Sequence, residues 1–207
     1  MGGAEQLRVQ PLQPGMVPRL PTVCDHCPLP RDEPPGTGQP WVDAAAETYG
    51  CCGVVAHLGA TPVGHILVSP PVNVPVRGPY ASAGVSPDAA VIMQFYVHPD
   101  HRGRRIGRRM LEELAGLLVR RRVAGIEVRA SRIGPTCLAP PEDWLLEQGF
   151  RVLREDALCI RLRMDLRTTR SWWPSLASVE QGVRQLLGRP ATGPEPAQSG
   201  TTSRLTP

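Results

Sequence analysis

Residues 95–110 read FYVHPDHRGRRIGRRM, and this stretch decides the fold. The apolar run that leads into it, residues 89–97 (AAVIMQFYV), has the length and hydrophobicity of a central β-strand buried on both faces. A short loop rich in Arg and Gly follows, and residues 107–123 then carry apolar side chains at helical spacing. The sequence therefore predicts a strand, a tight loop and an amphipathic helix in succession.

The loop between strand and helix has the composition of an anion-binding site. The first turn of a helix has backbone N–H groups without partners and a partial positive charge. Gly103 and Gly107 allow the backbone to approach a phosphate closely, and the arginines of residues 102–109 add bidentate donors. The motifs G-K-[ST] and G-x-G-x-x-G are absent, which excludes a Walker loop and a dinucleotide fingerprint. The segment predicts a site for a diphosphate-bearing ligand.

The segments on either side predict a single mixed α/β sheet. Residues 14–20 suggest a helical turn, residues 140–148 a short helix, and residues 21–50 an irregular loop that contains cysteines. Residues 51–58 and 63–69 form a hairpin around a Gly/Pro turn. The remaining strands are expected at residues 7–12, 126–130, 150–153 and 158–166.

These elements predict one domain over residues 7–168, preceded by a tail at residues 1–6. Residues 169–188, with Trp172 and Trp173, predict a C-terminal amphipathic helix. That helix either packs on the sheet of its own chain or forms a surface for a homodimer or another partner. Residues 189–207 have the composition of a disordered tail.

Charge and hydropathy restrict the classes of partner. The net charge is +4, and the arginines are concentrated near the predicted loop. A local basic cluster on a nearly neutral chain favours a phosphate-bearing ligand over nucleic acid, which requires a broad basic face. No apolar run approaches the length of a membrane span, and residues 1–10 lack the apolar core of a signal peptide. We therefore expect a cytoplasmic protein that does not associate with membranes.

The loop and its surroundings resemble the acetyl-CoA loop of the GNAT (Gcn5-related N-acetyltransferase) superfamily. In that family an [Arg/Gln]-x-x-Gly-x-[Gly/Ala] stretch follows a strand that ends in Val-x-Pro. Residues 97–99 (VHP) match the strand end, and residues 102–107 (RGRRIG) match the loop, with Arg105 in place of the first glycine. Residues 144–150 (WLLEQGF) resemble the helix-to-strand motif that ends in Gly-Phe. The resemblance covers roughly residues 5–166.

The resemblance implies a GNAT fold: a mixed, mostly antiparallel sheet flanked by helices, with splayed central strands. It also implies an enzyme that transfers an acetyl group from acetyl-CoA, or another acyl group from its CoA thioester, to a small-molecule or protein amine. The pantetheine arm lies in the gap between the splayed strands, and one backbone N–H polarises the thioester carbonyl. The residues carried over to cofactor binding are Phe95, Tyr96, Val97, Arg102, Gly103, Arg104, Arg105, Gly107 and Arg108.

The usual acid and base of the family are missing. Val91 occupies the position of a Glu that is common in some groups, and Leu145 occupies the position of the usual Tyr. Tyr96, His98 and Glu127 are the candidate substitutes, although His98 also fits an ordinary loop residue and Glu127 a charge on the strand surface. Glu142 and Asp143 are further candidates, which also fit ordinary charges at a helix N-terminus. Catalysis by proximity with water as the base is an alternative. So is a CoA-binding regulatory module that has lost turnover.

Six cysteines leave a metal site open. Cys24 and Cys27 form a C-x-x-C pair, and Cys52 with Cys137 would complete a candidate structural zinc site. Cys51, His26 and His57 are alternative ligands. Free thiols and a redox disulfide are the alternatives, and free thiols are favoured in a reducing compartment.

Overall fold

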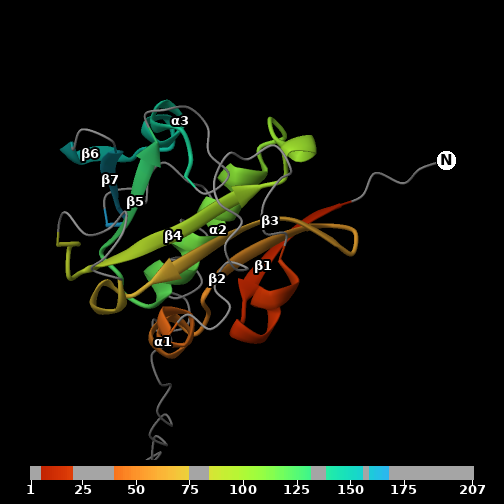
Figure 1. The fold of residues 1–207 in the computed structure, drawn as a ribbon, viewed down its shortest axis with the longest axis horizontal. Helices are drawn as coiled ribbons and strands as arrows, with labels where there is room; N and C mark the ends of the chain where they lie inside the picture. The colour runs from red at the N-terminus through yellow and green to blue at the C-terminus, as the bar shows by residue number, and fades with distance from the viewer. Residues whose placement is uncertain (1–5, 21–39, 75–83, 132–138, 156–158, 168–207) are drawn as a thin grey trace, which may run out of the picture.

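A computed structural model describes residues 6–20, 40–74, 84–131, 139–155 and 159–167 (Figure 1). The described part of the chain forms a seven-stranded sheet in the order β1-β2-β3-β4-β5-β7-β6. Every neighbouring pair is antiparallel except β4 and β5. The strands are β1 (Leu7–Leu12), β2 (Gly53–Leu58), β3 (Thr61–Ser69), β4 (Ala89–Val97), β5 (Gly125–Ser131), β6 (Arg151–Glu155) and β7 (Cys159–Asp165).

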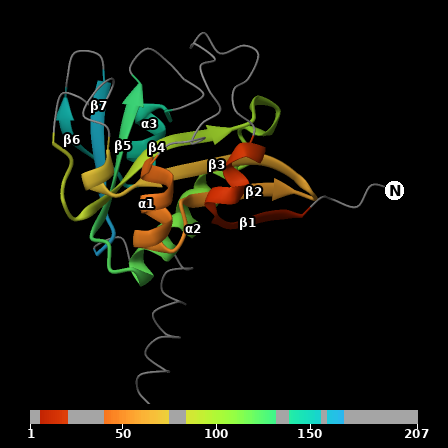
Figure 2. The ribbon, with the colours of Figure 1, turned by 60° about the horizontal axis from the view of Figure 1, so that its bottom comes forward.

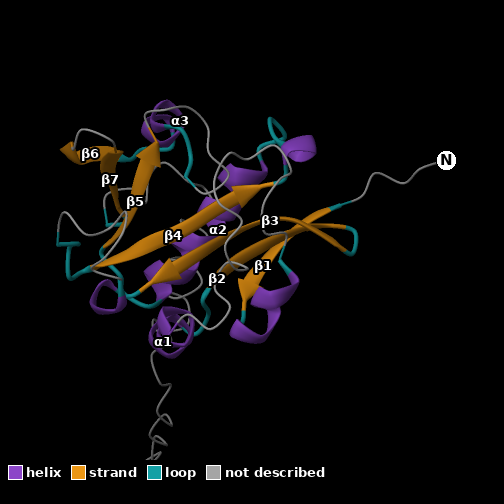
Figure 3. Cartoon of the chain, viewed as in Figure 1, coloured by secondary structure: helices purple, strands orange, loops and turns teal. Residues whose placement is uncertain are grey.

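Three α-helices and several short 3₁₀ helices complete the described part (Figure 3). They are α1 (Pro40–Tyr49), α2 (Ile106–Arg120), α3 (Glu142–Glu147), η1 (Pro14–Arg19), η2 (Pro71–Asn73) and η4 (Pro99–His101). The predicted mixed sheet is confirmed, as are the strand, loop and helix around residues 95–110. The predicted C-terminal helix at residues 169–188 lies outside the described residues. Among the helices that the structure describes, none has both the length and the hydropathy of a transmembrane span.

The expectation of an irregular loop over residues 21–50 was wrong for residues 40–49, which form α1 (Pro40–Tyr49). The buried residues Trp41, Val42, Ala45 and Tyr49 recur at helical spacing and pack in the core beside β3. This stripe was overlooked because the Pro- and Gly-rich residues before it dominated the composition of the segment. Residues 21–39 lie outside the described part.

The parallel pair β4 and β5 is joined over only three residues. Residues 89–91 pair with residues 125–127, and beyond this point the two strands diverge (Figure 1). On its other side, β4 pairs with β3 along most of its length, but the register shifts between the pairs Ile92–Val68 and Gln94–Leu67, which places a β-bulge at Met93. The predicted splay of the central strands is thus present, and beyond Val91 no described strand pairs with the edge of β4 that faces the gap.

The backbone direction along β4 shows which groups face this gap. The backbone N–H of His98 donates to the carbonyl of Val63 at 2.8 Å, so the backbone N–H of His98 points toward β3. Backbone groups alternate in direction along an antiparallel strand. The backbone of Tyr96 therefore also points to β3, while that of Phe95 and Val97 points to the gap. This direction favours Phe95 and Val97 for backbone contacts with a cofactor, and the cofactor-binding role expected of Tyr96 stays a prediction.

Helix α2 covers the face of the sheet formed by β1 to β4 (Figures 1 and 2). A Cβ atom on Gly64 of β3 would lie 3.2 Å from the Cε of Met110 on α2, so glycine permits close packing here. Met110, Leu111, Leu114 and Leu118 of α2 are fully buried. Together they pack α2 onto this face of the sheet.

On the face of the sheet turned away from α2, the imidazole of His65 is buried. His65 on β3 has no exposed surface and stacks on Tyr96 of β4, with ring centroids 5.4 Å apart. Within the described residues, neither ring nitrogen of His65 has a hydrogen-bond partner. Burial lowers the pKa of His65 to about 4; the amide of Gln94, which lies beside the ring without meeting hydrogen-bond geometry, opposes this shift. His65 is therefore neutral at neutral pH.

Acid is expected to destabilise the fold through His65. Because its pKa in the folded state lies below the ordinary value of 6.5, the unfolded state binds more protons between pH 6.5 and about pH 4. We expect the free energy of unfolding to decrease by up to roughly 3 kcal/mol as the pH falls through this window. Urea denaturation at a series of pH values measures it. The His65→Phe variant keeps a stacked ring and should lose this pH dependence; an unchanged slope in the variant contradicts the assignment.

Candidate functional site

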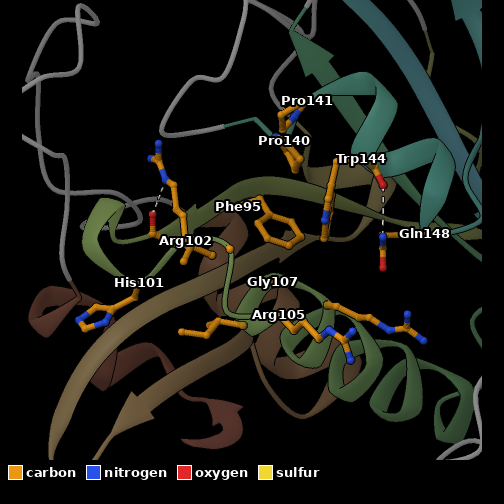
Figure 4. Close-up of a pocket in the computed structure, with 13 residues that line it drawn as sticks. Phe95, His101, Arg102, Arg105, Gly107, Pro140, Pro141, Trp144 and Gln148 are labelled. Carbon is orange, nitrogen blue, oxygen red and sulfur yellow. Dashed lines mark hydrogen bonds between the residues drawn. The ribbon is translucent and has the colours of Figure 1, made fainter.

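The described residues enclose a cavity of about 450 Å³ where the C-terminal end of β4 meets the N-terminus of α2 and one side of α3 (Figure 4). Its lining combines apolar rings with the Arg- and Gly-rich loop. The lining residues are Phe95, Val97, His101, Arg102, Gly103, Arg105, Ile106, Gly107, Arg108, Pro140, Pro141, Trp144 and Gln148.

Two aromatic rings form one wall of the cavity. Trp144 of α3 meets Phe95 of β4 edge-to-face, with ring centroids 5.4 Å apart (Figure 4). A Cβ atom on Gly107 would lie 3.4 Å from both rings, so the first turn of α2 passes directly beside them. This wall suits an uncharged chain, whereas the adjoining loop suits an anion.

The loop adopts the backbone conformation of an anion site despite Arg105. Arg105 is the N-cap residue of α2 and lies in the left-handed region, with φ 61° and ψ 13°. Gly103 has φ 74°. The left-handed region favours glycine, and the GNAT motif has a glycine at the position of Arg105. Arg105 therefore adopts a backbone conformation that suits the glycine of the motif. The substitution therefore leaves the path of the loop intact.

The backbone amides at the start of α2 are available to a ligand. The N–H of Arg109 donates to the carbonyl of Arg105 at 3.1 Å. The N–H groups of Ile106, Gly107 and Arg108 precede this bond and have no carbonyl one turn earlier in the helix. They carry the positive end of the helix dipole toward the cavity.

Side chains of the loop have separate roles. The Nε of Arg102 donates to the carbonyl of Val97 at 3.1 Å, which ties the loop to the end of β4 (Figure 4). The Nε of Arg108 lies 3.0 Å from Glu112, and Arg109 lies 3.6 Å from the same carboxylate. Arg102 is thus directed to the strand, while Arg108 is directed along the helix. Arg104 is exposed and does not line the cavity.

The three candidate catalytic side chains do not come together at the cavity. Tyr96 is almost fully buried against His65 on the face turned away from α2. His98 is part-exposed and accepts a hydrogen bond at Nδ1 from the Asp100 N–H at 3.4 Å. Glu127 is fully buried between Arg161 and Arg163, so the alternative reading as a strand-surface charge was wrong. A catalytic role for any of the three stays a prediction.

The positions of the usual acid and base are apolar in the structure as well. Leu145 has no exposed surface, and Val91 has almost none. Both belong to the buried interior of the sheet and helices, so no side chain at these positions exchanges protons.

Several cavity residues were not found from the sequence. Trp144 belongs to the segment that resembles the Gly-Phe motif, and nothing in its spacing indicates that it reaches Phe95. Pro140, Pro141 and Gln148 come from the same helix and its approach. Their contribution depends on how α3 is placed over the end of β4, which local sequence patterns do not specify.

The structure argues against Cys52 as a zinc ligand. Its thiol donates to the carbonyl of Leu12 at 3.2 Å, and burial raises its pKa to about 12. Cys51 and Cys52 are both buried and free. The described part of the chain contains no group of three or more potential metal-binding side chains. Cys24, Cys27 and Cys137 lie outside the described residues.

Comparisons with known proteins agree with this geometry. Ard1 from Thermoplasma volcanium is 11% identical with a TM-score of 0.53, and the match covers 77% of this chain and 97% of that one. PH1933 from Pyrococcus horikoshii OT3 is 16% identical with a TM-score of 0.51, covering 77% and 98%. A search of curated proteins found no match. These likenesses show the fold.

The family model of the GNAT acetyltransferases matches residues 22–133. The match spans more than half of the chain and includes the splayed strands, the loop and α2. The chain therefore belongs to the acetyltransferase (GNAT) family.

Proposed function

We propose that this protein is an acyl-CoA-dependent N-acyltransferase that transfers an acetyl group from acetyl-CoA to an amine. The observation that carries the proposal is the left-handed loop at the N-terminus of α2, which opens into the cavity beside the unpaired edge of β4. One end of this arrangement suits a diphosphate and the other an extended chain with amide groups.

The cofactor would lie along β4. The diphosphate binds the amides at the start of α2, and the pantetheine arm follows the unpaired edge, where the backbone of Phe95 and Val97 faces the gap. The rings of Phe95 and Trp144 exclude water from one side. The acyl end then points toward the narrow end of the gap, because β4 and β5 converge at Val91 and Glu127.

The reaction needs few side chains. A neutral amine attacks the thioester carbon, the C–N bond forms, the C–S bond breaks, and the amine proton is lost while the thiolate gains one. Fixed backbone N–H groups stabilise the oxyanion, and water or a buffer molecule takes the proton.

A second candidate function is a CoA-binding module without turnover. The apolar residues Val91 and Leu145 at the usual base and acid positions favour it. Acetyl-CoA binding is common to both candidates, whereas release of free CoA in the presence of an amine panel occurs only in the enzyme.

Calorimetric titration with acetyl-CoA tests the proposal. We expect micromolar binding by the wild type and a loss of about tenfold or more in Arg102→Ala, because this variant frees the loop from the Val97 carbonyl and removes a cation. Arg8→Ala, on β1 and outside the cavity lining, is the matched control and should bind as the wild type does. A wild type that does not bind acetyl-CoA contradicts the proposed function.

A further inference from the structure

Charged side chains surround the point where β4 and β5 separate. Glu127 is the last residue of β5 that pairs with β4, and its carboxylate is fully buried. Arg163 lies directly opposite on β7, and Arg161 lies two residues before it on the same face. The Nη1 of Arg163 is 3.6 Å from Oε1 of Glu127, and the Nε of Arg161 is 3.7 Å from Oε2. This face is the one turned away from α2.

The same arginines reach the segment that enters β4. Arg163 donates two hydrogen bonds to the carboxylate of Asp88, at 2.9 and 3.0 Å. Arg161 donates to the carbonyl of Gly84 at 2.6 Å, and the Ser86 N–H donates to Glu127 at 3.2 Å. Residues 84–88 are thereby fastened across β5 and β7. We call the four side chains of Asp88, Glu127, Arg161 and Arg163 the fork clasp.

The pKa shifts of Asp88 and Arg163 and the packing around Gly125 are consistent with an ion pair between the two side chains. The hydrogen bonds from Arg163 lower the pKa of Asp88, and those to Asp88 raise the pKa of Arg163. A Cβ atom on Gly125 would lie 2.8 Å from the Cζ and Nη2 of Arg163. Glycine at this position therefore leaves room for the guanidinium to pass from β7 to Asp88.

Stability alone is a weak reason for such a network. Burying ion pairs carries a desolvation cost, and well-packed apolar residues often stabilise a fold equally well. What this network provides is a defined geometry at a point where β4 and β5 share only three paired residues. Beyond Val91 and Glu127, the distance between β4 and β5 depends on the contacts that fix the two strands where they are still paired.

We propose that the fork clasp is a positioning network for acyl transfer. It fixes the opening between β4 and β5, and so aligns the thioester carbonyl with the backbone amides that β4 directs into the gap. This inference rests on the proposed function, because it assumes that an acyl-CoA arm occupies the gap. Its four residues act through β4 and do not touch the reacting atoms. A small displacement of the carbonyl is enough to weaken an oxyanion contact.

Isotope-edited infrared spectroscopy of bound [1-¹³C]acetyl-CoA tests the alignment without an acceptor amine. Hydrogen bonding to the carbonyl lowers its stretching frequency, so we expect the band in the wild-type complex to lie below that of free acetyl-CoA. The variants Asp88→Asn and Arg163→Gln should bind acetyl-CoA within about threefold of the wild type, because the loop at α2 is untouched. In both, the carbonyl band should return toward its free position.

Arg151→Gln is the matched control. Arg151 lies opposite Arg163 on the exposed strand β6 and is not part of the clasp, so its removal takes a positive charge from the same region and should leave the band in place. Asp88→Asn is nearly isosteric and half-exposed, which keeps one variant folded even if Arg163→Gln unfolds; thermal unfolding checks this.

The outcomes separate the two proposals. A wild type that fails to bind acetyl-CoA contradicts the proposed function before any variant is made, and the positioning role with it. Normal binding with an unshifted wild-type band, or an unchanged band in Asp88→Asn, overturns the positioning role alone. If the clasp variants lose acetyl-CoA affinity together with the shift of the carbonyl band, the network has a general structural role and the positioning role is overturned. An equal change of the band in Arg151→Gln also overturns it.

Discussion

Replacing Gly107 by Glu is expected to weaken acetyl-CoA binding by at least about a hundredfold. A Cβ atom at this position already lies 3.4 Å from the rings of Phe95 and Trp144, so the rest of the side chain is forced into the cavity. Its carboxylate then lies at the first turn of α2, where unbonded amides favour an anion and a diphosphate would bind. The carboxylate both repels the diphosphate and occupies its place. Calorimetric titration of the purified variant measures the loss.

Gly107→Gln and Gly107→Ala separate charge from size. Gln has nearly the shape of Glu without its charge and should bind more tightly than Glu but less tightly than the wild type. Ala adds one methyl group at ordinary contact distance and should cost the least. Thermal unfolding is expected to change little in all three, since Gly107 lies in the first turn of α2 beside the cavity. Wild-type affinity in the Glu variant would show that acetyl-CoA binds elsewhere.

Gly53→Ala is expected to destabilise the fold by at least about 3 kcal/mol. Gly53 begins β2 with φ 149°, a conformation that residues with a side chain rarely adopt. A Cβ atom there would also overlap the backbone carbonyl oxygen of Ile66 on β3. The β2–β3 pairing must shift to admit the methyl group, and this pairing supports β4 and the gap beside it. Urea denaturation measures the difference in the free energy of unfolding.

Gly15→Ala is the control for Gly53→Ala. A Cβ atom at Gly15 meets no atom within 4 Å, and its backbone does not have a positive φ. The change in unfolding free energy should stay within about 0.5 kcal/mol. Equal stability of the two variants would mean that β2 begins with a different backbone conformation from the one described.

The sequence predicted those parts of the fold that depend on local patterns. The apolar run at residues 89–97 matches β4 to the residue, and the periodic stretch that follows contains most of α2. The loop between them was identified because Gly and Arg at a strand-to-helix junction have a local chemical meaning. The helix α1 was missed because its short apolar stripe follows a long Pro- and Gly-rich stretch.

The role of single residues was harder to predict, because it depends on partners far away in the chain. Glu127 was a candidate base, but strand pairing places it opposite Arg163 and beside Arg161, where it closes the clasp. His65 was not singled out at all, and only the alignment of β3 with β4 stacks it on Tyr96.

By itself, the sequence determined the order of the seven strands, the Arg- and Gly-rich composition of the loop at α2, and the absence of the usual acid and base at Leu145 and Val91. The tertiary structure alone decided that Arg105 adopts the left-handed conformation, that Trp144 meets Phe95, and that β4 and β5 part after three residues. The physical reason is that periodicity and loop chemistry are encoded in neighbouring residues. Register, bulges and contacts between helices are set by packing between segments that are distant in the chain.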